Sequence, residues 1–344
     1  MKKNILLFTL LLTFTSSMHA QIFSRNVSKT GTTAATFLEI PVGAAAVGMG
    51  QAFVSVAGDA STLYWNPAGI SGIMQSQLYA AHTVWLAGTS FDYAALVLPI
   101  GGIGSFGLSF TSLTMPDMSV RTVELPEGTG EFFSAGDMAI GLSYALTLTD
   151  RFSIGFTGKY IQQKIWHESA TGFALDASTM FRTDLLNGMV IGATISNFGT
   201  SMQMQGRDTR TFTRVDPTKT GSNDQIPYDI EMNSWDLPLF MQIGVSTNVV
   251  KNDQFKWLVA VDAVHPNDNY ESVNAGTELS YQDFIFLRAG YSSLFQQESE
   301  GGLSLGVGIN SGNLLGTTGV KFDYAYRNFG RLENVHVFAV SLKL

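Results

Sequence analysis

Eight charged side chains could do chemistry together, because each lies on the small, polar side of a segment in which apolar and polar residues alternate. They are Lys159, Asp176, Arg182, Asp262, Glu278, Lys321, Asp323 and Arg327. If these segments are strands that close into a barrel, the eight charges face its lumen. They could form a paired network that stiffens the interior, or a polar permeation path. We favour the paired network, because unpaired charges in a narrow lumen are costly.

A glycine-rich run is the only other candidate for cofactor chemistry. Gly102, Gly104 and Gly107 have the G-x-G-x-x-G spacing of dinucleotide-binding loops. That site needs a helix directly afterwards and an acidic residue about 20 positions on. The run is followed instead by LSFTSL, which alternates as a strand. We interpret these glycines as turn and strand residues, and we expect no cofactor.

Catalytic and metal-binding patterns are weak. The histidines beyond the first 20 residues are scattered, at His82, His167, His265 and His336. None has a second histidine at metal-ligand spacing, and no nucleophile-elbow motif accompanies them. The oxygen-rich runs 216–224 and 266–269 lack the full calcium-loop spacing and its closing glutamate. The sequence therefore predicts no metal site and no enzyme.

Period-two alternation runs through most of the chain and predicts 14 strands. In 137–148, for example, Met138, Ile140 and Leu142 alternate with Ala139 and Gly141. The predicted strands are 76–85, 89–98, 105–113, 137–148, 152–166, 172–182, 189–197, 239–250, 255–264, 271–282, 284–294, 302–310, 320–327 and 335–344.

Three further features favour a transmembrane barrel over a soluble sandwich. The polar side of the strands is rich in Gly, Ala, Ser and Thr and carries charges of both signs, as in a lumen. Aromatic residues such as Trp85, Trp166 and Tyr281 lie near strand ends, where interfacial girdles occur. The longest connections, 114–136 and 198–238, fall on one side of the predicted barrel, and the short turns fall on the other.

Composition supports this class and excludes others. Only 14% of the 344 residues are charged, against roughly 25% in soluble proteins, while 45% are apolar. The net charge of -8 argues against a nucleic-acid partner, which requires a basic surface. Cysteine is absent, so the chain has neither disulfides nor thiolate metal ligands.

The first 20 residues have the pattern of a secretory signal peptide. Lys2 and Lys3 precede a short apolar run, and Met18-His19-Ala20 ends in a small residue. The alternative, a membrane anchor, needs about 20 apolar residues, and this run is shorter. We expect cleavage before Gln21.

Residues 47–71 form an irregular, turn-rich stretch before the strands begin, which suggests a plug placed against a barrel. Asp59 and Ser61 are predicted helix caps, and Asn66 to Gly69 is a predicted tight turn in which Gly69 can take a positive φ. The glycines at 48, 50 and 58 would let the backbone pass through a crowded lumen. The candidate plug residues are Gly48, Gly50, Asp59, Ser61, Tyr64, Trp65, Asn66, Pro67, Ala68 and Gly69.

Two runs carry a resemblance to a known family. GMGQAFVSVAGDASTLYWNPAGIS at 48–71 resembles the N-terminal motif of the PorV/PorQ family, within the wider group of FadL-like outer-membrane barrels. VDAVHPNDNYESVNAGTELSYQDFIFLRAGY at 261–291 resembles a second block of PorV-like sequences. The resemblance implies a 14-stranded barrel whose N-terminal segment is a hatch inside the lumen. It also implies export to the outer membrane of a Bacteroidota-type cell.

The same resemblance implies a function in type IX secretion, in which PorV binds the C-terminal signal domain of cargo proteins at the cell surface. We therefore expect a signal peptide at 1–20, an N-terminal segment with hatch at 21–74 and an outer-membrane barrel at 75–344. The expected partners are membrane lipid and secretion machinery or cargo, bound through the long loops. The alternative is a FadL-like channel for hydrophobic small molecules.

Overall fold

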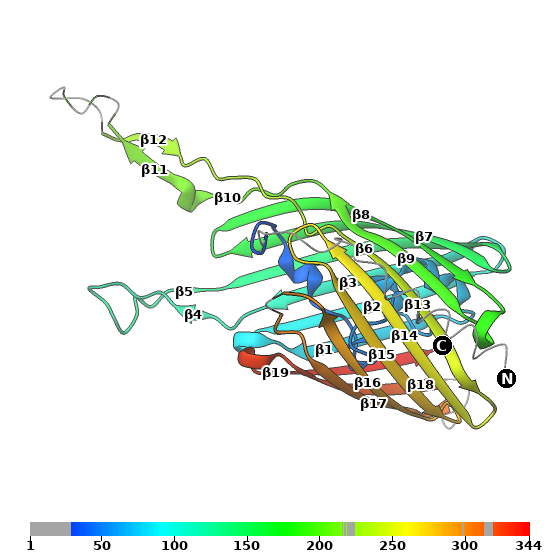
Figure 1. Ribbon diagram of the computed structural model, residues 1–344. Coiled ribbons are helices and arrows are strands. Elements are labelled where there is room, and N and C mark those ends of the chain that lie inside the picture. The colour runs from blue at the N-terminus through cyan, green and yellow to red at the C-terminus, as the bar shows by residue number, and fades with distance from the viewer. Residues whose placement is uncertain (1–28, 215, 217, 219–223, 298, 313–318) are drawn as a thin grey trace.

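The computed structural model describes residues 29–214, 216, 218, 224–297, 299–312 and 319–344 (Figure 1). The predicted signal peptide and its cleavage site lie outside the described residues. Within them, no helix is long and apolar enough to cross a membrane.

Fourteen antiparallel strands close into a barrel, as the sequence predicts. Each strand pairs with its neighbours in chain order, and β1 pairs with β19 to close the wall. The strands are β1 Gln77–Val84, β2 Ser90–Ile100, β3 Gly104–Thr114, β6 Ala135–Thr149, β7 Phe152–Ile165, β8 Glu168–Arg182, β9 Val190–Gly199, β13 Phe240–Lys251, β14 Phe255–Pro266, β15 Ser272–Tyr281, β16 Ile285–Leu294, β17 Leu303–Asn310, β18 Gly319–Asn328 and β19 Asn334–Lys343.

The alternation of side chains decides which face of the wall is buried. In β8, Phe173 and Leu175 are each 62% exposed on the outside, whereas Asp176 is 1% exposed on the inside. The same two-residue period runs along β1, which alternates buried and exposed residues throughout. Apolar residues thus face outward and small or polar ones inward, as expected for a barrel whose outer face contacts lipid.

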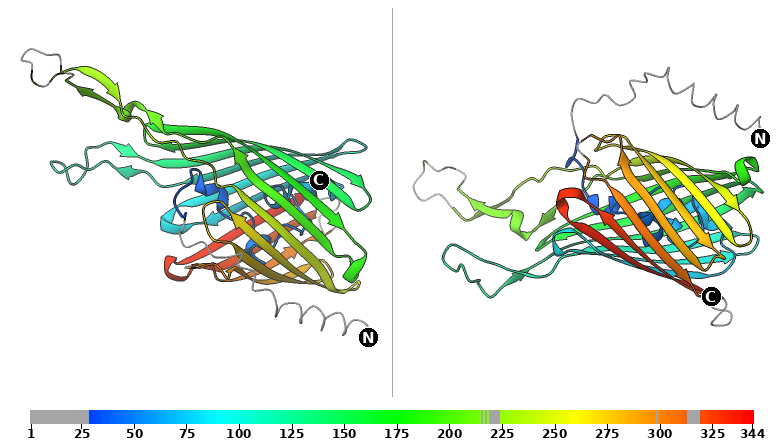
Figure 2. Two further views of the ribbon diagram at one scale, coloured as in Figure 1. Left: turned by 45° about the horizontal axis from the view of Figure 1, so that its top comes forward. Right: turned by 60° about the horizontal axis from the view of Figure 1, so that its bottom comes forward.

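The two longest connections lie at the same end of the barrel, here called the loop end. Both fold into hairpins that extend beyond the wall, as Figures 1 and 2 show. One pairs β4 Met118–Ser119 with β5 Phe132–Phe133, and the other pairs β11 Arg210–Thr213 with β12 Ile226–Asp229. A further short strand, β10 Gln205–Gly206, and the 3-10 helix η5 Arg207–Thr209 precede β11.

Most strand boundaries lie within two residues of the prediction, and the start of β8 differs by four. β8 begins at Glu168 and not at 172, because residues 168–171 continue the ladder with β7 and pair on their other side with β10. The β7–β8 connection at the loop end is therefore a two-residue turn, Trp166 and His167. The opposite end, here called the turn end, carries short turns such as the one between β2 and β3, and the final residue.

The other regular elements of the described chain are short helices. Besides η5, three lie in connections: η3 Leu86–Gly88, η4 Leu185–Asn187 and η7 Gly330–Leu332. Four lie before the first strand: η1 Thr36–Glu39, α2 Ala44–Gly48, α3 Thr62–Trp65 and η2 Pro67–Gly72. These N-terminal elements, blue in Figures 1 and 2, run inside the wall.

Candidate functional site

The lumen is filled by the inner segment, defined here as residues 36–73. Nearly every residue from 40 to 70 is buried, although the segment has only four short helices. Its α2 helix contacts β16 to β19, and its η2 helix contacts β3 and β6 to β8. Because these strand groups belong to different sides of the wall, the segment bridges the interior of the barrel.

Asn66 fixes the centre of the inner segment. Its Oδ1 accepts a hydrogen bond from the Ala68 N–H at 3.1 Å, which caps η2. Its Nδ2 donates to the carbonyl oxygens of Val54 at 2.8 Å and Thr179 at 3.0 Å. Pro67 occupies the first position of η2, where a proline loses no hydrogen bond. One side chain therefore joins two parts of the segment to strand β8.

Asp262, on strand β14, also holds the inner segment, at Phe53 and Val54. Its Oδ2 accepts hydrogen bonds from the backbone N–H groups of Phe53 at 2.7 Å and Val54 at 2.9 Å. The side chain is completely buried, so these bonds replace its lost hydration. A carboxylate proposed as part of a lumen network thus binds backbone of the inner segment.

Close backbone contacts fit the inner segment against glycines of the wall. Gly50, with φ of 62°, packs on Gly290 so tightly that a Cβ on either residue would overlap the other's backbone. A Cβ on Gly276 would overlap the Met49 carbonyl oxygen in the same way. Gly48 lies against Gly306, where a Cβ would be 2.9 Å from the Cα of the wall residue. The wall and the segment are therefore complementary at backbone level.

Three details of the predicted plug motif need correction. Gly58 is exposed with nothing within 4 Å of an added Cβ, so no crowding requires a glycine there. Gly69 has no positive φ, since Asn66 to Gly69 enters a 3-10 helix and not a tight turn. A glycine is needed at position 69 for packing instead, because an added Cβ would overlap Thr62. Ser61 makes no side-chain cap; its N–H donates to Asp59 at 3.0 Å.

The aromatic pair of the motif packs the loop-end half of the segment. Tyr64 and Trp65 contact each other edge to face, with ring centroids 5.0 Å apart. The Tyr64 hydroxyl donates to the Leu38 carbonyl oxygen and the Trp65 Nε1 to that of Val42, each at 2.9 Å. Both aromatics therefore tie α3 back to the start of the inner segment.

All eight predicted lumen charges lie on the inward side of the wall, and two groups of them form ion pairs. Lys159 pairs with Asp176 at 2.7 Å and donates to the Asn197 side chain at 2.8 Å. On the other side, Lys321 lies 3.3 Å from Asp323 and 3.7 Å from Asp59 of the inner segment.

Arg288 is the central residue of that second group, and the sequence analysis did not select it. Its Nε donates to Glu278 and its Nη1 to Asp323, each at 2.6 Å, and the arginine side chain is fully buried. Its position between Leu287 and Ala289, in a strand of period two, is the signal that could have identified it.

Two inward arginines have no carboxylate partner among the described residues. Arg182 donates to the Ser153 hydroxyl at 3.3 Å near the turn end. Arg327, at the loop end, is 6% exposed and lies over the Phe329 ring at 4.1 Å. The predicted paired network therefore includes some of the eight charges and leaves these two outside it.

The described residues enclose a cavity at each end of the barrel interior. The loop-end pocket, of about 350 Å³, is lined by Glu39, Tyr64, Trp85, Tyr270 and Arg327 among others. The turn-end pocket, of about 360 Å³, is lined by Ser55, Gly72, Arg182 and Lys343 among others. The two pockets share no lining residue, because the inner segment lies between them.

Glu39 has an unusual environment at the loop-end pocket. Its side chain is exposed and lines the cavity. Burial first, and then the Asp268 carboxylate, raise the pKa of Glu39 to about 8. This shift favours the protonated form of Glu39.

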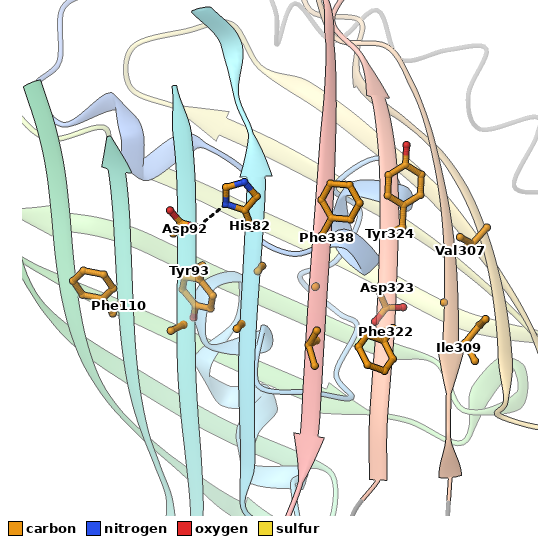
Figure 3. Close-up of a pocket in the computed structure, with 16 residues that line it drawn as sticks. His82, Asp92, Tyr93, Phe110, Val307, Ile309, Phe322, Asp323, Tyr324 and Phe338 are labelled. Atoms are coloured by element: carbon orange, nitrogen blue, oxygen red, sulfur yellow. Dashed lines mark hydrogen bonds and ion pairs between the residues drawn. The ribbon is translucent and has the colours of Figure 1, made fainter. Parts of the chain in front are cut away.

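A third hollow, of about 630 Å³, lies on the outer face of the wall (Figure 3). Small residues such as Ala80 and Ala94 form its floor between larger rings, including Phe110 and Phe338. His82 and Asp92 pair across neighbouring strands at 2.7 Å at its edge. Because these side chains point outward, this hollow belongs to the lipid-facing surface and not to the lumen.

Possible metal ligands lie apart in the described part of the chain. Among the described residues, no three His, Cys, Asp or Glu side chains are placed to hold a metal ion. The residues of the glycine-rich run serve a turn and a strand, with Gly102 at a φ of 77° and Gly107 packed against Leu63.

Comparisons with known proteins agree with this architecture. The family model described as "Type IX secretion system protein PorV" matches residues 23–262. The fold is similar to a FadL homologue of Pseudomonas aeruginosa, with 12% identity, a TM-score of 0.52, and coverage of 88% of this chain and 97% of the other. It is also similar to the toluene transporter TodX of Pseudomonas putida, with 11% identity, a TM-score of 0.54, and coverage of 88% and 96%. No curated protein sequence matches significantly.

Proposed function

The chain belongs to the PorV family of type IX secretion system proteins, and we propose that it serves protein secretion by binding protein partners at the loop end of an outer-membrane barrel. The outer-membrane location follows from the family and from the FadL-like barrel. The partner-binding role is our proposal. The observation that carries it is the combination of a filled lumen with two long hairpins that project from one end.

The projecting hairpins supply the surface that a partner needs. Residues 115–134 and 200–239 contain the β4–β5 and β11–β12 hairpins, which extend past the wall (Figure 2). In outer-membrane barrels the long loops face the cell exterior. Exposed apolar side chains on these connections include Val123, Phe132 and Phe212, which are 94%, 63% and 57% exposed. Such side chains suit a protein interface.

We further propose that the inner segment acts as a closed hatch. The anchors from Asn66 and Asp262 and the backbone contacts at Gly276 and Gly290 support a segment that stays in place. In this proposal the barrel is a scaffold for partners and not an open pore.

The test is a loop-trimming experiment in cells that secrete signal-bearing cargo. One variant replaces residues 116–133 with a short turn, a second does the same for 203–234, and the control carries Gly101→Ala in a turn of the opposite end. We expect the control to display cargo at the surface and at least one trimmed variant to retain it in the periplasm. Normal display by both trimmed variants, at wild-type barrel levels, would reject the proposal.

The alternative is a FadL-like channel for hydrophobic small molecules. The fold similarity to the toluene transporter TodX is the observation in its favour. A channel needs a path from the loop-end pocket past the inner segment, and the two pockets share no lining residue. Uptake of an aromatic hydrocarbon that depends on this protein, with normal cargo display in its absence, would support the channel instead.

A further inference from the structure

Arg327 is buried like Arg288, but in the described part of the chain it lacks the carboxylate partners that Arg288 has. Arg288 is held by two carboxylates at 2.6 Å each. Arg327 is also buried, yet no carboxylate among the described residues pairs with it, and its Nε has no hydrogen-bond partner. A buried guanidinium without an anion is costly, so an anion from outside would stabilise it.

The remaining contacts of Arg327 leave it oriented and still charged. The Gln51 side-chain oxygen, when turned toward it, accepts from Nη1 at 2.8 Å and from Nη2 at 3.0 Å. The Phe329 ring lies under the guanidinium at 4.1 Å. A neutral amide and a ring fix the plane of the group without neutralising it.

A neighbouring polar group is also unsatisfied. Ser304 lies directly opposite Arg327 in the β17–β18 register. Its hydroxyl is fully buried and has no partner within the described chain. Buried polar atoms without partners are rare, and one beside the unpartnered Nε of Arg327 indicates a place prepared for a ligand or for ordered water.

The cavity beside Arg327 has the lining of a binding site for a polar ligand. Its wall contains amide side chains, Gln242, Asn269 and Gln296, together with the rings of Trp85 and Tyr270. Amides suit hydrogen-bonding groups better than an alkyl chain, and aromatic rings suit flat or apolar groups. Glu39 lines the same pocket but forms no ion pair with Arg327, so it leaves the charge of Arg327 uncompensated.

We propose that the loop-end pocket binds a carboxylate through Arg327, on a ligand whose neighbouring groups hydrogen-bond to the pocket amides, as a peptide does. A single planar guanidinium matches a planar monoanion such as a carboxylate. The site lies in the lumen below the hairpins, so it exists independently of whether the hairpins bind cargo.

The experiment is calorimetric titration of the purified barrel in neutral detergent at pH 7 with three probes. These are N-acetyl-Ala-Ala-Phe with a free carboxyl group, the same peptide as its C-terminal amide, and octanoate. We expect the peptide acid to bind and the amide to bind about 10-fold or more weakly, because a charge-assisted hydrogen-bond pair is lost. Octanoate distinguishes a peptide carboxylate from an aliphatic one.

Variants assign the binding to Arg327. Arg327→Gln is expected to weaken binding of the acid about 10- to 100-fold, and Arg327→Lys, which keeps the charge, is expected to lose less. The matched control is Arg182→Gln, at the turn end, which should bind like the wild type. Heat-modifiable migration on gels verifies that each variant is folded.

Each outcome decides the proposal. Binding of the peptide acid that is lost in Arg327→Gln and kept in Arg182→Gln supports it. Binding of octanoate alone, equal binding of peptide acid and amide, unchanged binding in Arg327→Gln, or no binding of either acid overturns it.

Discussion

At the scale of single residues, the structure of the barrel interior depends on which charged side chains form ion pairs. Arg288 reaches Asp323 across strand β17, and this is possible because Gly308 stands between them. A Cβ on Gly308 would overlap Asp323 and lie 3.0 Å from Arg288 Nη1. The two-residue period of the sequence is enough to predict that charges point inward. Their partners depend on register and on small residues of the strand between, which a sequence pattern does not specify.

Removal of Arg288 should destabilise the barrel strongly. Arg288→Met leaves Glu278 without its cation and leaves Asp323 with Lys321 alone. Loss of one partner from a buried ion pair costs about 3–5 kcal/mol of unfolding free energy. The measurement is the temperature at which the folded gel band disappears. The control, Arg151→Gln, breaks the exposed Arg151–Asp184 pair and should change stability by less than about 1 kcal/mol.

Glu39 should make stability depend on pH. Its folded pKa of about 8 is above the ordinary value of 4.5, so the folded state keeps a proton that the unfolded state loses. Folding therefore becomes less favourable as pH rises from about 4.5 to about 8. We expect the Glu39→Gln variant to gain stability relative to the wild type across this window, measured by unfolding temperature at several pH values. A constant difference across the window would contradict the buried-acid interpretation.

At the scale of elements, the inner segment is held by shape and by a few polar anchors, and not by helix strength. Its helices have four to six residues, too short to be stable alone. The sequence predicts a compact, turn-rich plug from its glycines and from Asn66 to Gly69. The sequence does not predict the 3-10 helix η2 or the exposed position of Gly58, because both depend on which part of the wall each residue contacts.

An added methyl group on the wall should loosen this fit. Gly276→Ala places a Cβ where it would overlap the Met49 carbonyl oxygen, and overpacking of this kind costs about 1–3 kcal/mol. Gly101→Ala, which meets nothing within 4 Å, is the matched control. Limited proteolysis is the measurement: we expect cleavage within residues 40–60 to be faster in Gly276→Ala only. Equal cleavage in the two variants would show that the close contact is not important.

At the scale of the whole molecule, the chain is a closed wall around its own N-terminal segment, with its extended surfaces at one end. The strand count and the sides on which long and short connections lie were predictable, because both follow from alternation and loop length. The extension of β8 and the hairpins of the long connections were not, since they arise from pairing between strand ends and loop residues. A similar barrel fold occurs in the toluene transporter TodX, so the fold alone does not separate a transport channel from a scaffold for protein partners. The filled lumen is the feature on which that choice depends.

The most direct test of this account is the ion conductance of the purified barrel in a planar lipid bilayer. The account predicts no stable single-channel steps for the wild type, and steps of open-pore size when residues 36–73 are deleted and the remaining barrel still shows heat-modifiable migration. Stable open-pore steps in the wild type would contradict it.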